Sequence, residues 1–300
     1  MPIQNVGTLL ENLVLVEVAR DLLADAEELV LCSSFAMPPL SEWRHNAQNV
    51  GFGPAELDRV ADGDFQPDDA GFTALLGRGL RAGRNLGPSS VLLTLLLARV
   101  EQKGTRVWLN DLATGGHYPE TISALRRIRQ VVALLTGLED DQAHPPTITG
   151  DAYPGSTAGL RPFLDAAPPQ APRLGFLDPM RYVRGVREGN QTSSVDHRRW
   201  LELLRSGAGG PVVAVHFTGN SNQPLLRQEI QSMLADARAV ECTGLRVFKR
   251  QHYAVVVATW GSASVESIEA GVQGAWEGWV ASIAPPLGDL TIWSEEDLLD

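Results

Sequence analysis

Helical and strand patterns alternate along most of this chain, and that alternation limits the fold more than any other feature of the sequence. From residue 88 onward, apolar stretches with a helical period are each followed by a short run rich in apolar strand formers. In one clear step, the segment 87–104 predicts a helix with Pro88 in its first turn, and 106–112 predicts the strand that follows. Such alternation predicts an α/β protein with a parallel sheet, helices on both faces and right-handed crossovers.

The same rhythm predicts helices and strands from the first residues to the last. The expected helices span 6–23, 119–137, 156–166, 195–207, 222–237 and 263–283, and the expected strands span 27–34, 147–151, 173–178, 211–217 and 288–293. Residues 244–260 differ, because two β-rich runs lie too close together for a crossover helix and therefore predict an antiparallel hairpin.

These patterns predict a doubly wound, mostly parallel Rossmann-like sheet of about seven strands with an antiparallel hairpin strand. Residues 35–87 interrupt the rhythm with Gly, Pro and acidic residues around two short helical patches. We expect residues 1–34 and 88–300 to form the Rossmann-like domain, and 35–87 to form an inserted acidic lobe or lid.

The net charge of −11 disfavours nucleic acid as a partner, because it opposes the counterion release that drives such binding. The acids gather in residues 1–75 and the bases in 173–253, so a basic protein partner is a candidate for the acidic lobe. No apolar run reaches the length of a membrane helix, and no basic segment precedes the first apolar stripe, which favours a cytoplasmic protein without a membrane partner.

The order of elements resembles the class I S-adenosylmethionine-dependent methyltransferases, in which a hairpin inserts the final strand antiparallel. Local motifs are similar to those of RlmJ-type ribosomal-RNA adenine-N6 methyltransferases and three-Cys-motif partner proteins. The similar segments are "NVGTLLEN" before "CSSFAMPPL", "LGPSSVLLTLLL" at 86–97, and "DPMRY" at 178–182. The resemblance implies a methyl-transfer fold with a donor pocket at the carboxyl ends of the first three strands.

In that pocket the resemblance places Cys32, Ser33 and Phe35 around the amino-acid part of S-adenosylmethionine. Met37 and Pro39 stand where the families have glycines, and proline both fixes φ and removes an N–H donor. The donor pocket is therefore expected to be altered, and binding of S-adenosylmethionine is left open.

Two acids at strand ends would contact the adenosine. Asp111 would accept hydrogen bonds from the ribose hydroxyls, and Asp151 would accept one from the adenine amino group. A capping or turn role remains open for Asp111, and a turn role for Asp151, since Gly150 and Pro154 lie nearby.

The acceptor side would be built on the segment that follows the fourth parallel strand. The resemblance makes Asp178 the acceptor of a hydrogen bond from the target amine, with Pro179 beside it and Tyr182 stacking on the base. Arg181 is an insertion relative to the family motif, and with Arg184 it would bind an anionic group. An Asp178 that only caps the next helix, and a solvated arginine loop, are the structural alternatives.

His216 ends the next strand, so with Asn220 it would border the same crevice as Asp178. We expect His216 to take part in catalysis and Asn220 to bind substrate, although a strand-end histidine also serves as a loop anchor. The His, Cys and acid spacings match no metal site, so no metal is expected.

Three interpretations of function remain open from the sequence. The first is a methyltransferase acting on a nitrogen or oxygen nucleophile with an altered donor pocket. The second is a biosynthetic enzyme that acts on a small anionic substrate without S-adenosylmethionine, and the third is a non-catalytic subunit or binding module.

Overall fold

A computed structural model of the 300-residue chain provides the fold. It describes residues 6–34, 60, 62–64, 69–82, 90–112, 147–151, 157, 159–177, 197–219, 222–283, 289–294 and 297. The expected helix 119–137 and most of the expected insertion 35–87 lie outside these residues.

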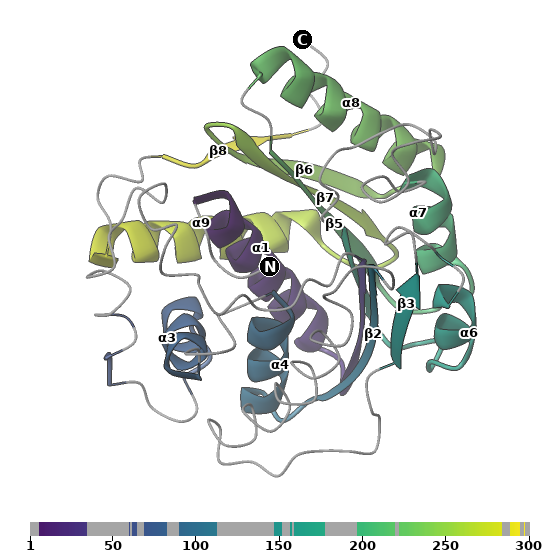
Figure 1. The fold of residues 1–300 in the computed structure, drawn as a ribbon, viewed down its shortest axis with the longest axis horizontal. Coiled ribbons are helices and arrows are strands. Elements are labelled where there is room, and N and C mark those ends of the chain that lie inside the picture. Colours follow the sequence, from purple (N-terminus) through teal and green to yellow (C-terminus); the bar gives the residue numbers. More distant parts are fainter. Residues whose placement is uncertain are drawn as a thin grey trace.

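One twisted sheet of eight strands organises the described residues (Figure 1). The strand order is β3-β2-β1-β4-β5-β7-β6-β8, and β1 to β5 are parallel to one another. The strand expected at 288–293 is β8, which pairs with β6, so the sheet has eight strands where about seven were expected. The strands are β1 (Glu28–Ser34), β2 (Gly104–Leu112), β3 (Thr147–Asp151), β4 (Arg173–Leu177), β5 (Val212–Gly219), β6 (Gly244–Arg250), β7 (Tyr253–Trp260) and β8 (Thr291–Trp293).

The hairpin predicted over 244–260 is present, and its second strand inserts into the sheet. β7 runs antiparallel to both β5 and β6, with Val212 opposite Trp260 and Arg250 opposite Tyr253. Gln251 in the two-residue turn has a φ of 51°, a left-handed backbone conformation of the kind that tight hairpin turns require. The sheet is therefore mixed, with its parallel pairings confined to β1–β5.

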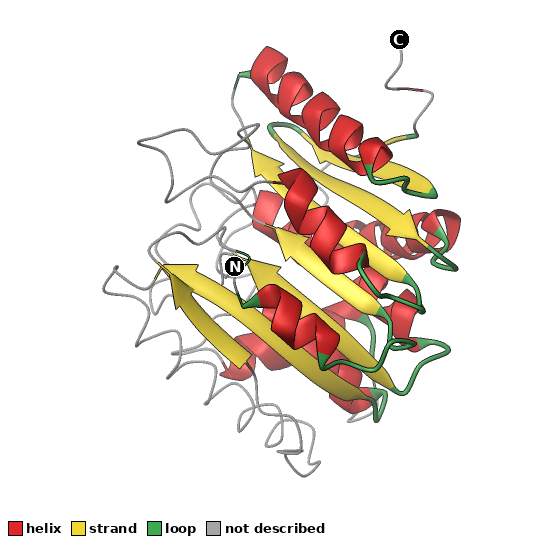
Figure 2. Ribbon diagram, turned by 90° about the vertical axis from the view of Figure 1, so that its right-hand side faces the viewer, coloured by secondary structure: helices red, strands yellow, loops and turns green. Residues whose placement is uncertain are grey.

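Helices cover both faces of the sheet, because alternate side chains of each strand point to opposite faces and both sets are apolar. Figure 2 views the molecule from the side on which α6, α7 and α8 cross the sheet. The first layer is α1 (Val6–Leu23), α3 (Phe72–Ala82), α4 (Ser90–Val100) and α9 (Val265–Ile283), and the second is α6 (Leu160–Asp165), α7 (His197–Arg205) and α8 (Gln223–Ala239).

The first helix lies at the centre of its layer. α1 packs against α4 and α9 as well as against strands of the sheet, and Leu9 to Ala19 are buried throughout. This explains why the apolar residues of α1 are not confined to one stripe. Phe72 and Leu75 of α3 join the same core, so this part of segment 35–87 packs against α4.

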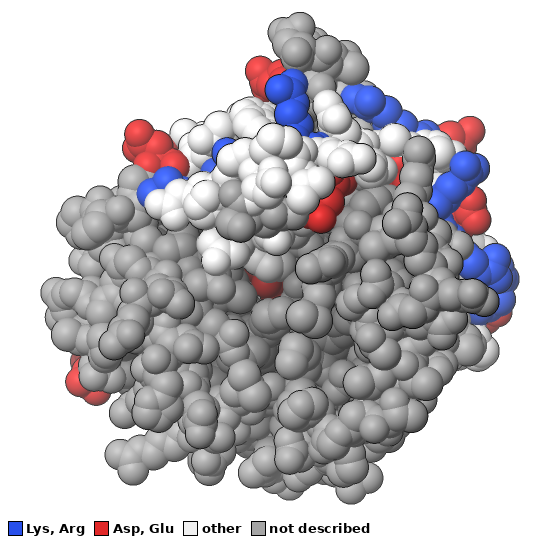
Figure 3. All heavy atoms as spheres, turned by 45° about the horizontal axis from the view of Figure 1, so that its top comes forward, with Lys and Arg blue, Asp and Glu red and all other residues white. Residues whose placement is uncertain are grey.

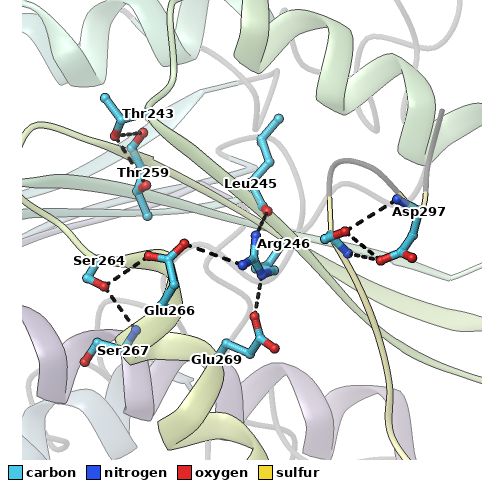
Figure 4. A network of polar contacts seen from close by, with 10 residues as sticks. Thr243, Leu245, Arg246, Thr259, Ser264, Glu266, Ser267, Glu269 and Asp297 are labelled. Atoms are coloured by element: carbon cyan, nitrogen blue, oxygen red, sulfur yellow. Dashed lines mark hydrogen bonds and ion pairs between the residues drawn. The ribbon is translucent and has the colours of Figure 1, made fainter.

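Arg246 of β6 fixes α9 to the sheet (Figure 4). Its guanidinium contacts the carboxylates of Glu266 (3.5 Å) and Glu269, and it donates to the Leu245 carbonyl at 2.9 Å. Ser264 accepts a hydrogen bond from the Ser267 amide at 3.1 Å and so caps the start of the helix.

The second layer is fixed at the carboxyl end of α7. Arg173, buried at the start of β4, donates from Nη1 to the carbonyls of Leu204 (2.9 Å) and Ser206 (2.8 Å). A cation at a helix carboxyl end also complements the helix dipole. Burial lowers the pKa of Arg173, and the nearby Cys32 and Asp165 act against that shift.

Figure 3 shows that basic and acidic side chains lie next to one another on the described part of one face. Ion pairs of the described surface include Arg205 with Glu241 at 3.0 Å and Arg198 with Glu202 at 3.1 Å. Among the described residues, no helix combines the length and the apolar character needed to span a lipid bilayer.

Candidate functional site

The carboxyl ends of the central parallel strands define the candidate site. Ser34, the last residue of β1, pairs with Leu177, the last residue of β4, and Leu177 pairs with His216 of β5. β5 continues to Gly219, so it extends beyond the end of β4. His216 therefore lies at the level where the chain leaves β4 toward residue 178.

The two acids assigned to the adenosine pocket occupy neighbouring strand ends. Asp111 pairs with Gly150, and Leu112 pairs with Asp151, so the two acids are one residue out of register on β2 and β3. Asn110, one residue before Asp111, is buried and pairs with Ser34. The fold thus brings Asp111 and Asp151 to the same edge of the sheet as Ser34 and Leu177.

Cys32 and Ser33 are both buried, on opposite faces of β1. Cys32 belongs to the core between the sheet and α6–α8, and burial raises the pKa of its thiol despite the proximity of Arg173. Ser33 lies on the face covered by α1, since it alternates with Cys32 along the strand. Their assignment to a donor pocket remains a prediction.

Phe35 of the expected donor pocket and most residues assigned to the acceptor side lie outside the described part of the chain, and their roles remain predictions. The acceptor-side residues are Asp178, Pro179, Arg181, Tyr182, Arg184 and Asn220.

His216 is buried and contacts a second histidine that the sequence analysis did not assign to the site. Its Nδ1 lies 3.0 Å from Nε2 of His197, the first residue of α7, and the two rings meet at 62°. Among the described residues its Nε2 is also buried and has no hydrogen-bond partner. Burial, and secondarily the neighbouring His197, hold the pKa of His216 well below 6.5, so the ring is neutral at pH 7.

A carboxylate from α8 contacts the second histidine. Nδ1 of His197 lies 3.2 Å from Oδ2 of Asp236, and both side chains are nearly inaccessible to solvent. Asp236, His197 and His216 therefore form a continuous buried chain of contacts from α8 through the start of α7 to the sheet. A histidine oriented by a second polar group is the usual arrangement for a fixed tautomer.

The indole of Trp200 packs beside the ring of His216. The two rings are nearly perpendicular, at 75°, with centroids 6.1 Å apart. The indole reaches the sheet because Gly175 of β4 has no side chain. A Cβ at that position would lie 2.2 Å from Cη2 of Trp200. The close approach of α7 to β4 thus depends on this glycine.

The described residues contain no group of three His, Cys, Asp or Glu side chains arranged to hold a metal ion. Asp236, His197 and His216 contact one another in sequence instead of converging on one point. These three side chains are consequently suited to hydrogen bonding and proton movement.

No protein-family model and no curated protein matches this chain. Among solved structures, it is similar to protein LPL1258 of Legionella pneumophila, described as a member of family DUF519. The TM-score is 0.57 and the identity 12%, and the match covers 97% of this chain and 98% of that one.

A second similar structure is a candidate class I S-adenosylmethionine-dependent methyltransferase of Listeria monocytogenes. That match has a TM-score of 0.41 and 6% identity, and it covers 96% of this chain and 74% of the other. Its TM-score is too low to support an argument. The Legionella protein is similar at the level of the fold, which does not bear on the RlmJ-type kinship.

The strand order therefore carries the fold assignment. The inserted antiparallel β7 and the helices on both faces give an α/β sheet consistent with a Rossmann-like methyltransferase fold. The substrate and the activity are a separate question, because one fold serves many chemistries.

Proposed function

We propose that this protein is an S-adenosylmethionine-dependent methyltransferase that acts on a nitrogen or oxygen nucleophile through an altered donor pocket. The observation that carries the proposal is the strand order, with β7 inserted antiparallel between β5 and β6. It is the arrangement that the resemblance to class I methyltransferases implies. In open α/β sheets, ligands bind beyond the carboxyl ends of the strands.

The residues at those ends are chemically suited to the donor. Asp111 on β2 would accept hydrogen bonds from the ribose hydroxyls, and Asp151 on the adjacent β3 would accept one from the adenine amino group. The segment that follows Ser34 would contact the amino-acid part. When bound, S-adenosylmethionine would supply a methyl group on a positively charged sulfur.

The acceptor would lie at the end of β4, where Asp178 follows Leu177 and His216 lies alongside. In this proposal Asp178 accepts a hydrogen bond from the nucleophile, Tyr182 stacks on the acceptor, and Arg181 and Arg184 bind an anionic part of it. The RlmJ-type activity on ribosomal RNA is one candidate reaction of this class.

Calorimetric titration with S-adenosylmethionine and S-adenosylhomocysteine tests the donor site. We expect micromolar affinity in the unmodified protein and a loss of roughly tenfold or more in Asp111→Asn, which removes a charged acceptor. Asp25→Asn is the matched control, since Asp25 is exposed in the turn before β1, at the opposite edge of the sheet. Equal weakening in both variants, or no binding of either ligand, would contradict the proposal.

One sequence feature favours a second candidate. Met37 and Pro39 replace the glycines of the donor loop, which suits an enzyme that uses the crevice for a small anionic substrate without S-adenosylmethionine. For that function neither S-adenosylmethionine nor S-adenosylhomocysteine would bind. Inorganic phosphate or sulfate would bind instead, and Arg181→Ala would abolish that binding.

A further inference from the structure

We propose that His197 and Asp236 are positioning residues that hold His216 with its proton on Nδ1, so that Nε2 accepts the hydrogen bond, and then the proton, of a substrate N–H or O–H group. This inference rests on the proposed function in one respect, which is that the N–H or O–H group belongs to the nucleophile to be methylated. The arrangement of the three side chains stands independently of the methyl donor.

The tautomer follows from the order of contacts. A carboxylate has only acceptor atoms, so an ionised Asp236 requires the proton of His197 to be on Nδ1, which lies 3.2 Å from Oδ2. In the proposed state His197 carries one proton only, so its Nε2 has a lone pair, and that atom lies 3.0 Å from Nδ1 of His216. His216 must therefore donate from Nδ1, which leaves its Nε2 as an acceptor.

The location of His216 suits a substrate contact. It pairs with Leu177, and Leu177 pairs with Ser34, so the ring is level with the carboxyl ends of β4 and β1. Within the described residues Nε2 is buried and makes no hydrogen bond. An unpaired acceptor in a buried position is costly, and a bound donor group would remove that cost.

The protons balance without any further reagent. When the substrate group gives up its proton, that proton binds Nε2 of His216 and produces an imidazolium that keeps its Nδ1–H bond to His197. The electron pair of the broken N–H or O–H bond stays on the substrate atom, which becomes the stronger nucleophile. The carboxylate of Asp236, one ring away, stabilises the new positive charge.

The first test is the tautomer itself, measured on the full chain without any ligand. Long-range proton–nitrogen NMR spectra of histidine-labelled protein at pH 7 should show His216 protonated on Nδ1 and unprotonated on Nε2. The His216→Asn variant assigns the signals. A proton on Nε2 of His216 in the unmodified protein would overturn the proposal, whether or not any variant folds.

The second test removes the carboxylate. Asp236→Leu should convert the His216 signals to a mixture of tautomers, whereas Glu17→Leu should leave them unchanged. Glu17 is the matched control because it is also a buried carboxylate, but on α1 across the sheet. Unchanged His216 signals in Asp236→Leu would show that Asp236 does not set the tautomer.

The third test separates this inference from the proposed function. In an enzyme that binds S-adenosylmethionine, His216→Asn should lower kcat about 100-fold or more while changing donor affinity less than threefold. Transfer that is insensitive to His216→Asn overturns the acceptor role. A protein that shows the expected tautomer but binds no S-adenosylmethionine instead contradicts the methyltransferase assignment alone.

Discussion

Gly175 of β4 lies directly against the indole of Trp200 in α7, so closely that a Cβ on residue 175 would be 2.2 Å from Cη2 and 2.4 Å from Cδ2 of Leu204. Both neighbours are fully buried. The helix that begins with His197 therefore rests on the sheet at a position of β4 where a side chain is missing.

We expect Gly175→Ala to destabilise the protein by about 1–3 kcal/mol, the usual cost of overpacking a core. Because Trp200 must move, its emission spectrum should also shift. Chemical denaturation followed by tryptophan fluorescence measures both effects.

Gly274→Ala is the matched control for that substitution. Gly274 lies in α9, and nothing is within 4 Å of a Cβ built there. Alanine should therefore stabilise the helix, by up to about 1 kcal/mol. If Gly175→Ala were equally harmless, the described contact between α7 and β4 would be wrong.

Arg173→Lys should lower the free energy of unfolding by about 1–3 kcal/mol. The guanidinium donates to two carbonyls at the end of α7, and a lysine ammonium on a flexible stem does not reproduce that geometry in a buried position. Arg198→Lys, on the exposed surface of the same helix, should change stability by less than about 0.5 kcal/mol. Urea denaturation of the two variants makes the comparison.

Cys32 should resist alkylation in the folded protein. Burial raises the pKa of its thiol, so the reactive thiolate is scarce, and the surrounding core excludes the reagent. Cys242 is partly exposed and should react first with iodoacetamide. Peptide mass spectrometry after a timed pulse distinguishes the two, and equal labelling would place Cys32 at an accessible surface.

Stability should fall on acidification through the range in which unfolded histidine takes up a proton. The pKa of His216 in the folded protein is depressed well below 6.5, so below about pH 6.5 the unfolded chain binds a proton that the folded chain does not. The loss from this group is at most about 1.4 kcal/mol per pH unit. Urea denaturation between about pH 7.5 and about pH 5.5 measures this loss of stability, since that interval brackets the usual pKa of histidine.

The His216→Asn variant isolates that contribution, and its stability should depend less on pH. A comparison is needed because burial raises the pKa of Glu17, which acts in the opposite direction. His252→Asn, in the exposed turn between β6 and β7, is the control and should keep the slope of the unmodified protein. Identical slopes in all three proteins would contradict the role given to His216.

The sequence was sufficient for the order of the described elements because each of these helices and strands has its own local period. The antiparallel pairing of β6 with β7 followed from the short spacing between two β-rich runs. The placement of His216 near the carboxyl ends of the parallel strands also followed from its position near the end of a strand. These are local signals, and they do not depend on which segments meet in space.

The partners of His216 could not be predicted from local signals, because His197 and Asp236 come from two different helices. A signal was present, however. His197 shares the buried face of α7 with Trp200 and Leu201, and Asp236 lies among the buried residues of α8 beside Met233 and Ala237. A polar residue on an apolar helix face needs a buried partner, and two such residues could have been paired with each other.

The central place of β1 in the sheet has a consequence for biosynthesis. Val30 pairs with Arg173, almost half the chain later, so one edge of β1 has no neighbour until β4 has left the ribosome. During that interval an apolar strand is exposed to other nascent chains. We expect the folding of this protein to be slow and its yield to depend on chaperones and on the rate of translation.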